Sequence, residues 1–448
     1  MLRDNHGLAV STDAPAAIAA LERTVEGFLK YRTDTSAHLK QLLQADPQLG
    51  YAHCLQGYFG MLGFSEGLVP RAADAARKAR GFIANATRRE QMHVDALDAW
   101  VAGDLDRMLD TWEAILAEHP HDVVAFRLAH FNAFWLGRPK AMRASVDRIL
   151  PKWSAELPAW GTVLACRCFA YEEAGDYSAE QDGRKAVEID PADLWATHAV
   201  AHVLEMQGRT QEGIAWIGSL EGNWGSANNV AHHVWWHRGM FHLERREFDA
   251  VLDLYDRRFR NLQSPLTQAQ PDLYIDIQNA VSILFRLELQ GVSVGNRWGE
   301  IADKAETRIG DHRSAFTLPH WMMALAATGR DAAAQRTLAA MADFGRGTGT
   351  LAPIVGKVAL PVCQAVVAHH KGDYAAALTA MRPALKDMAH LGGSHAQQDV
   401  LEQLFLHCAV KADRPDDVHL VLRRQAAKFP MPLKRRVGYA SAVATFGA

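Results

Sequence analysis

The segment Trp195-Ala-Thr-His198-Ala-Val-Ala-His202-Val-Leu-Glu205-Met-Gln-Gly208 decides how the rest of the chain folds. His198, His202 and Glu205 lie at i, i+4 and i+7, which places them above one another on one helical face. Gly208 ends the helix, because glycine readily takes the left-handed conformation that closes a helix C-terminus. The segment therefore predicts a helix with a stripe of titratable side chains, followed by a tight turn.

Similar turns recur along the chain at intervals of about 33 to 45 residues, close to the period of tetratricopeptide-like helical hairpins. The turn signals begin at Gly103, Gly137, Gly175, Gly208, Arg246, Gly291, Gly329 and Gly372. Prolines at 47, 120 and 191 stop the second helix of a pair, and no useful alternating β pattern is found. We predict an all-α fold of tetratricopeptide-like hairpins in a right-handed superhelical array, an α-solenoid that encloses an inner cavity.

The array is expected to cover residues 87–428, preceded by an N-terminal helical part at 1–86 and followed by a partly ordered tail at 429–448. Asp13-Ala14-Pro15 predicts a helix start, and Thr87 with Glu90 forms a capping box. The glycine-rich segment 344–362 follows a helix and lacks the Lys-Ser/Thr of a phosphate loop. We expect a flexible connection or a lid there.

Composition narrows the class of protein. The chain has 448 residues, 49% of them hydrophobic, with a formal net charge of −3 and a pI near 6.7. That balance argues against a nucleic-acid partner and against a polybasic membrane binder. The five cysteines are odd in number and form no CxxC, and neither a signal peptide nor a membrane span is expected. These features predict a cytoplasmic protein in a reducing compartment, and a homo-oligomer is compatible with them.

Several longer motifs occur in order between residues 89 and 399. They are Arg89-Glu90 with His93, Gly103-Asp104, His119-Pro120, Leu128-Ala129-His130, His198 to Gly208, His232-His233-Val234-Trp235-Trp236-His237, Arg286 to Gly291, Leu360 to Ala365, Gly372-Asp373-Tyr374 and Gly392-Gly393-Ser394-His395-Ala396-Gln397. Together they resemble the tetratricopeptide repeat protein 38 family. The resemblance implies a fold of tetratricopeptide-like hairpins in one array and carries over no activity.

Two regularities point polar side chains toward the interior of such an array. The offsets of His198, His202 and Glu205 from Gly208 match the inward positions of the first helix of a hairpin. A second position, nine residues before successive turns, is occupied by Cys166, His237, Ser282, His320 and Cys363. Equivalent positions in successive units face the same way, so we expect these side chains to gather around one cavity.

Three interpretations of the histidine stripe remain open. In the first, His198, His202, Glu205 and His233 bind a divalent metal such as zinc, because His at i and i+4 is a common ligand pair. His237 is an alternative ligand there. In the second, the same groups perform acid–base chemistry without a metal, with pKa values displaced by burial. In the third, they are core histidines satisfied by hydrogen bonds.

The wider set of candidate catalytic residues comprises His198, His202, Glu205, His237, His320, His395 and Cys363. His395 lies in the first turn of a helix, whose dipole favours the neutral imidazole. Cys363 could form a thiolate pair with His320 or His395, although a free cysteine is usually a small buried hydrophobe. Four tryptophans could form an apolar wall for a substrate or simply pack between helices: Trp224, Trp235, Trp236 and Trp321.

Two functions from different classes follow. The first is an enzyme that acts on a small molecule in the inner cavity by acid–base or metal-assisted, hydrolytic-type chemistry. Nothing in the sequence indicates a nucleotide or redox cofactor. The alternative is a scaffold that binds protein or peptide segments without catalysis, which is the usual role of tetratricopeptide arrays.

Overall fold

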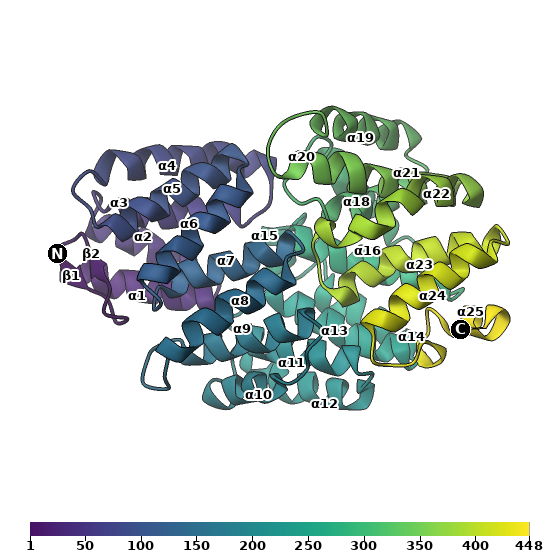
Figure 1. The fold of residues 1–448 in the computed structure, drawn as a ribbon, viewed down its shortest axis with the longest axis horizontal. Coiled ribbons are helices and arrows are strands. Elements are labelled where there is room, and N and C mark those ends of the chain that lie inside the picture. The colour runs from purple at the N-terminus through teal and green to yellow at the C-terminus, as the bar shows by residue number, and fades with distance from the viewer. Residues whose placement is uncertain (448) are drawn as a thin grey trace. The chain divides into compact units, whose positions relative to one another are not determined.

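The computed structural model describes residues 1–447, and the described chain is built almost entirely of helices (Figure 1). The one sheet within these residues is a short antiparallel pair of strands, β1 (Leu2–Arg3) and β2 (Ala9–Val10), in which Leu2 lies opposite Val10. The predicted all-α class of helical hairpins is confirmed.

The chain forms two compact units, each with its own core. The first unit comprises residues 1–134, 138–199 and 222–228, and the second comprises 135–137, 200–221 and 229–448, of which residues up to 447 are described. The boundary between them passes through one helix, after Ala199. The predicted division of the chain at residues 86 and 428 stays a prediction.

Helices of the first unit pair as hairpins in chain order, α1 with α2, α3 with α4, α5 with α6 and α9 with α10. Their bounds are α1 (Pro15–Leu29), α2 (Thr35–Ala45), α3 (Gly50–Met61), η1 (Glu66–Leu68), α4 (Val69–Phe82), α5 (Arg88–Ala102), α6 (Leu105–Glu118), α7 (Val123–Trp135, its last residue in the second unit), α8 (Pro139–Ile149), η2 (Leu150–Lys152), α9 (Trp160–Glu173), α10 (Glu180–Ile189) and the start of α11 (Leu194–Met206).

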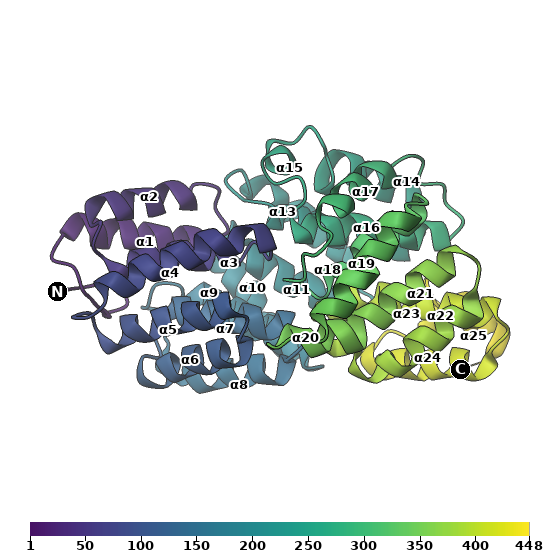
Figure 2. The ribbon, with the colours of Figure 1, turned by 90° about the horizontal axis from the view of Figure 1, so that it is seen from above.

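In the second unit α21 lies beside α22, and α23 beside α24, as Figure 2 also shows. After the end of α11, the elements are α12 (Thr210–Leu220), η3 (Glu221–Asn223), α13 (Val230–Glu244), α14 (Phe248–Leu254), η4 (Tyr255–Phe259), α15 (Pro265–Ala269), α16 (Tyr274–Leu289), α17 (Trp298–Thr307), α18 (Thr317–Ala327), α19 (Asp331–Phe344), α20 (Leu351–Ile354), η5 (Val355–Ala359), α21 (Leu360–His370), α22 (Tyr374–Met381), η6 (Arg382–Leu391), α23 (His395–Lys411), α24 (Pro415–Lys428), η7 (Leu433–Arg435) and α25 (Ala440–Phe446).

All eight predicted turn residues have a positive φ, between 60° and 81°. Seven are glycines, which take this conformation without steric penalty. The eighth is Arg246, at φ 60°, where a Cβ must be tolerated. A further turn of the same kind, at Asp413 (φ 50°) between α23 and α24, carries no glycine and was not expected. The turn chemistry therefore sets the hairpin boundaries that the sequence predicts.

The caps and stops also match the sequence pattern. Thr87 and Glu90 form the predicted capping box before α5, and Ser394 and Gln397 form another before α23. Helices α2, α6 and α10 each end within two residues before a proline. The helix starts and ends are therefore fixed largely by local chemistry.

Inner and outer helices of the second unit differ in burial. Every residue of α16 from Tyr274 to Leu287 is buried, and so is every residue of α18 from Thr317 to Leu325. By contrast, α24 buries only a stripe at spacings of three and four, and α19 does the same. Helices α16 and α18 are thus enclosed on all sides, and α19 and α24 present one polar face to solvent.

The glycine-rich segment differs from the expected flexible connection. After a short loop it forms the continuous helical stretch Leu351–His370, made of α20, η5 and α21. Gly345 packs on Gly356 so closely that a Cβ on Gly345 would lie 2.6 Å from the Gly356 Cα. The glycines there permit a close backbone approach between two helical segments.

This stretch is the one helix in the described residues that is long and apolar enough to cross a membrane, with a mean hydropathy of 1.8. We expected no run of about 18 apolar residues without a charge, and this stretch does not contradict that expectation. It contains Lys357, and α21 packs against α18, α19 and α22. A packed helix of a core passes the same test, so the stretch is weak evidence for a membrane span.

The tail is more ordered than expected. Residues after Pro430 form η7 and α25, and Arg436 and Tyr439 are buried. Val437 N–H donates to Glu244 on α13 at 2.8 Å. The tail is ordered because the Tyr439 hydroxyl donates to the buried carboxylate of Asp399, a contact that the sequence pattern of the tail does not reveal.

Candidate functional site

The histidines that the sequence singled out lie on α11 and α13. Asp193 precedes α11 and its carboxylate accepts the backbone N–H of Ala196, which satisfies one of the free amides of the first turn. Asn229 precedes α13 and donates from its side chain to Asp276 of α16 at 2.7 Å. These contacts fix the start of each helix and therefore which side chains share a face.

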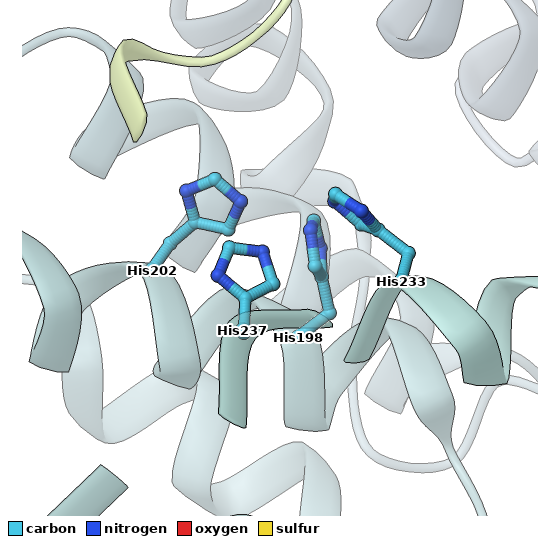
Figure 3. A group of neighbouring side chains, drawn as sticks. All are labelled: His198, His202, His233 and His237. Atoms are coloured by element: carbon cyan, nitrogen blue, oxygen red, sulfur yellow. The ribbon is translucent and has the colours of Figure 1, made fainter. Parts of the chain in front are cut away.

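Four imidazoles come together: one ring nitrogen from each of His198, His202, His233 and His237 lies within 4.8 Å of the others (Figure 3). His202, His233 and His237 belong to the second unit. His198 stands one turn before His202 on the continuous helix α11, at the edge of the first unit. We call the three residues of the second unit the histidine cluster.

Hydrogen bonds orient two rings of the cluster. Nδ1 of His237 lies 2.6 Å from Glu205 Oε2, and Nδ1 of His233 lies 2.8 Å from Asn279 Oδ1. Both partners are acceptors, so each Nδ1 carries a proton and donates it. The lone pair of each neutral ring is consequently on Nε2.

The rings also pack closely against one another and against an indole. The centroids of His202 and His237 are 4.4 Å apart, and those of His233 and His237 are 4.8 Å apart, both edge to face. Trp236 stacks on His233 at 5.1 Å with an interplanar angle of 10° and donates to Ser282 Oγ at 3.0 Å. Aromatic surfaces therefore hold the imidazoles in place.

Burial dominates the electrostatics of the cluster. It lowers the pKa of His233 and of His237 well below the usual value, and neighbouring histidines lower both further. Burial likewise raises the pKa of Glu205 to about 7, against the opposing effects of His202 and Arg286. The imidazoles of His233 and His237 are thus held neutral, which is the protonation state in which histidine binds metals or accepts a proton.

A charged layer of the second unit lies next to Glu205 and was not predicted. Arg436 donates to Asp399 at 3.1 and 3.2 Å, and the Tyr439 hydroxyl donates to the same carboxylate at 2.6 Å. Arg286 donates to the Ala396 carbonyl at 2.8 Å and lies 3.7 Å from Asp399. An arginine inside the apolar run of α16 was the available sequence signal.

The structure exchanges one member of the predicted metal set. Glu205 does not belong to the four-imidazole group. It accepts a hydrogen bond from His237, and His237 is the fourth member of the group. The reason is reach: α13 brings His237 beside His202, and the Glu205 carboxylate meets the far side of that ring. Asn279 and Asp276, which anchor α13, were also missed, although both are polar residues in the apolar helix α16.

The other candidates each lie in a different environment. His320 Nδ1 donates to the Phe316 carbonyl at the start of its own helix, at 2.8 Å, and burial lowers the pKa of His320 to about 4. His395 is the first residue of α23, and burial, with Lys428 and His202, lowers its pKa to about 4. Burial raises the pKa of the Cys363 thiol, which disfavours the thiolate of the hypothetical Cys–His pair.

The tryptophans do not share one environment either. Trp236 contacts the histidine cluster, whereas the Trp235 indole donates to Glu221 at 3.0 Å. Trp321 is buried in α18, and Trp224 belongs to the first unit. The predicted substrate wall therefore reduces to Trp236.

The first unit has its own buried histidine, in a charged network that we call the His93 network. Asp122 Oδ2 lies 2.9 Å from His93 Nε2 and accepts from Arg89 at 2.7 Å. The Tyr58 hydroxyl lies 3.2 Å from His93 Nδ1. Burial opposes ionisation of Asp122, but His93 and Arg89 outweigh it and hold the pKa of Asp122 well below its usual value.

Neither of the two pockets that the structure describes is lined by the histidine cluster. The two described pockets both belong to the first unit: one of about 20 Å³ beside Arg89 and Asp122, and an open one beside Met92 and Arg107. The first has room for about one water molecule. The predicted ligand cavity beside the histidines is not among them.

Comparisons with known proteins give a limited result. No family model matches the chain. The chain is similar to a solved structure described as the human IFIT1 dimer with m7Gppp-AAAA. The match covers 94% of this chain and 96% of the other, with 12% sequence identity and a TM-score of 0.40. At that identity and TM-score the likeness assigns no function to this chain.

One expectation is corrected by that comparison. Net charge and pI were taken to exclude a nucleic-acid partner, yet a helical-repeat protein matched over nearly the whole chain is described with m7Gppp-AAAA. The exclusion is wrong on physical grounds, because overall charge reports the sum over a surface and not the charge of one binding patch.

Proposed function

We propose that this chain is a binding scaffold of tetratricopeptide-like hairpins whose partner, a protein or a peptide, meets the outer helices. The observation that carries the proposal is the contrast in burial between inner and outer helices. α16 and α18 are enclosed on every side, while α19 and α24 expose a polar face. A partner that binds without unfolding the unit meets the second helices of the hairpins.

The exposed faces suit polar recognition. Gln335 and Arg336 on α19, and Asp416 and Arg423 on α24, are exposed. Interfaces of non-obligate complexes are about as polar as the rest of a protein surface, and arginine is enriched in them. The partner class that fits is therefore a folded protein or peptide with mixed charge.

The motif resemblance supports a family proposal of the same kind. We infer a relationship to the tetratricopeptide repeat protein 38 family, because its most specific motifs coincide with structural features of this chain. Gly208 closes α11 in the left-handed conformation, and Ser394 with Gln397 caps α23. We also infer a cytoplasmic location, since all five cysteines are buried and unpaired, as in reducing compartments.

Binding of the full-length chain to arrays of immobilised peptides and proteins tests this proposal. We expect it to bind peptides or proteins with a Kd of about micromolar strength, and hydrogen–deuterium exchange to show protection on α19 and α24 but not on α16 or α18. A single-stranded RNA oligonucleotide is the second probe. Binding of RNA without binding of any peptide would replace the proposed partner class, and absence of both would reject the scaffold proposal.

Acid–base catalysis is the second candidate, favoured by one observation. The buried Glu205–His237 pair, with 2.6 Å between Oε2 and Nδ1, is an arrangement in which a carboxylate orients an imidazole base. If it is correct, His202→Ala keeps the fold and abolishes turnover of a small-molecule substrate. Unchanged turnover in that variant would reject the catalytic candidate.

A further inference from the structure

We propose that the histidine cluster binds one divalent transition-metal ion, with zinc as the first choice. His202, His233 and His237 supply three nitrogen ligands from two helices of one unit. His198, one turn before His202 on α11, is the candidate fourth ligand. The proposal is independent of the scaffold function and of its partner.

The donor set selects the class of metal. Imidazole nitrogens without a carboxylate suit zinc, copper, nickel or cobalt, whereas magnesium and calcium require oxygen ligands. Four ligands of this kind match the tetrahedral coordination that zinc adopts in structural sites. In such a site the nitrogens lie about 3.4 Å apart, since each Zn–N bond is about 2.0–2.1 Å. The present separations, at most 4.8 Å, would shorten toward this value when the ion binds.

The outer contacts are those of a metal site. Histidine ligands commonly donate their second ring N–H to a carboxylate or an amide oxygen, which fixes the ring and its tautomer. Glu205 accepts from His237, and Asn279 accepts from His233, each at Nδ1. Both rings therefore direct Nε2, the nitrogen with the lone pair, away from these partners.

Burial and charge complete the site. The cluster histidines are 1%, 6% and 0% exposed, and Trp236 covers the face of His233. Asp399 is already paired with Arg436, whereas Glu205 accepts from His237 of the cluster and would lie next to a bound cation. A divalent ion would thus stand beside a buried carboxylate in a site that excludes water, where attraction between the charges is strong.

Metal analysis of full-length protein purified without a His tag tests the proposal. We expect about one zinc ion per chain, and its loss in both His202→Ala and His237→Ala. The matched control is His320→Ala, which also removes a buried histidine of the second unit but not one of the cluster. It should keep the ion. Retention of zinc in both cluster variants would overturn the proposal.

Two further measurements cover a variant that fails to fold. Metal-free wild-type protein titrated with Co²⁺ should give the visible absorption of tetrahedral nitrogen coordination at one ion per chain; a six-coordinate spectrum, or no uptake of either Co²⁺ or Zn²⁺, would reject the site. Glu205→Gln should keep the stoichiometry and weaken zinc affinity by about 10- to 100-fold, measured by competition with a chromophoric chelator. Unchanged affinity in Glu205→Gln would remove the carboxylate from the proposal. A protein without zinc would leave peptide binding at α19 and α24 untouched, so the two proposals fail separately.

Discussion

The two units bury histidine side chains among different kinds of partner. In the His93 network, the imidazole lies between Asp122 and Tyr58, and Arg89 balances the carboxylate. In the histidine cluster, the imidazoles lie close together, and His237 and His233 donate to Glu205 and Asn279 respectively. The first arrangement pairs the imidazole with opposite charge, and the second is the one that we propose as a metal site.

The comparison shows that burial alone does not identify a functional histidine. Both sites are as buried as any core residue, so exposure does not separate them. What separates them is the partner of the second ring nitrogen: a charged network in the first unit and a group of imidazoles in the second. A set of changes in both units tests this distinction.

Breaking the His93 network should have the largest effect. Asp122→Ala leaves the buried guanidinium of Arg89 without its carboxylate, which costs about 3–5 kcal/mol of unfolding free energy. Urea denaturation measures the loss, and metal analysis of the same sample should show an unchanged zinc content. A stability change below about 1 kcal/mol would mean that the network is not structural.

Acid should destabilise the second unit through the buried His320. His320 has a folded pKa of about 4, below its unfolded value of about 6.5, so its stabilising contribution is present above pH 6.5 and is lost as the pH falls toward 4. The loss approaches about 3 kcal/mol. The contribution of Asp122, whose pKa is lowered, is lost only below about pH 4.

Thermal denaturation between pH 7 and pH 4 measures this difference. His320→Gln removes the titrating group, so we expect its stability to fall less steeply than that of the wild type. Asp122→Asn should leave the slope between pH 7 and pH 5 unchanged. Parallel curves for the wild type and His320→Gln would contradict the assignment.

Removing the charge of Glu205, which accepts from His237, should have an intermediate effect on stability that is seen only when zinc is present. Glu205→Gln keeps an acceptor oxygen for His237 but removes the charge, so zinc should raise the melting temperature of this variant less than that of the wild type. The comparison variant is Tyr58→Phe in the His93 network. It should lower stability, because His93 and Trp112 both lose a partner, and leave the zinc-induced shift as in the wild type.

The smallest effect is expected for the hydrogen bond of Trp236, the indole that stacks on His233 of the cluster. Ser282→Ala removes the acceptor of Trp236, and the loss of that hydrogen bond should cost about 1 kcal/mol in urea denaturation. A loss well above about 3 kcal/mol would show that Trp236 positions the cluster more strongly than one hydrogen bond explains.

Much of the fold follows from local chemistry that the sequence displays. The turn glycines, the prolines after α2, α6 and α10, and the capping boxes at Thr87 and Ser394 act over a few residues, so their effect could be predicted. The turn at Asp413 and the order of the tail could not. One places a non-glycine residue at positive φ, and the other depends on Arg436 reaching a carboxylate on α23.

The candidate site was predictable in part for the same reason. His198 and His202 share a helix, so their common face follows from spacing alone. The positions of His237 beside His202 and of Glu205 next to His237 depend on how α13 packs, which spacing along the chain does not reveal. The interior beside these residues was expected to be a ligand cavity, whereas side chains of α16 and α18 are buried on all sides.

Anomalous diffraction at the zinc absorption edge, from crystals of the full-length protein grown with zinc, tests the difference between the two sites most directly. We expect one strong peak about 2.0–2.1 Å from ring nitrogens of His202, His233 and His237, and none at His93. A structure with no peak at the cluster, or with zinc bound instead beside His93 and Asp122, would contradict the assignment of the second-unit histidines as the metal site.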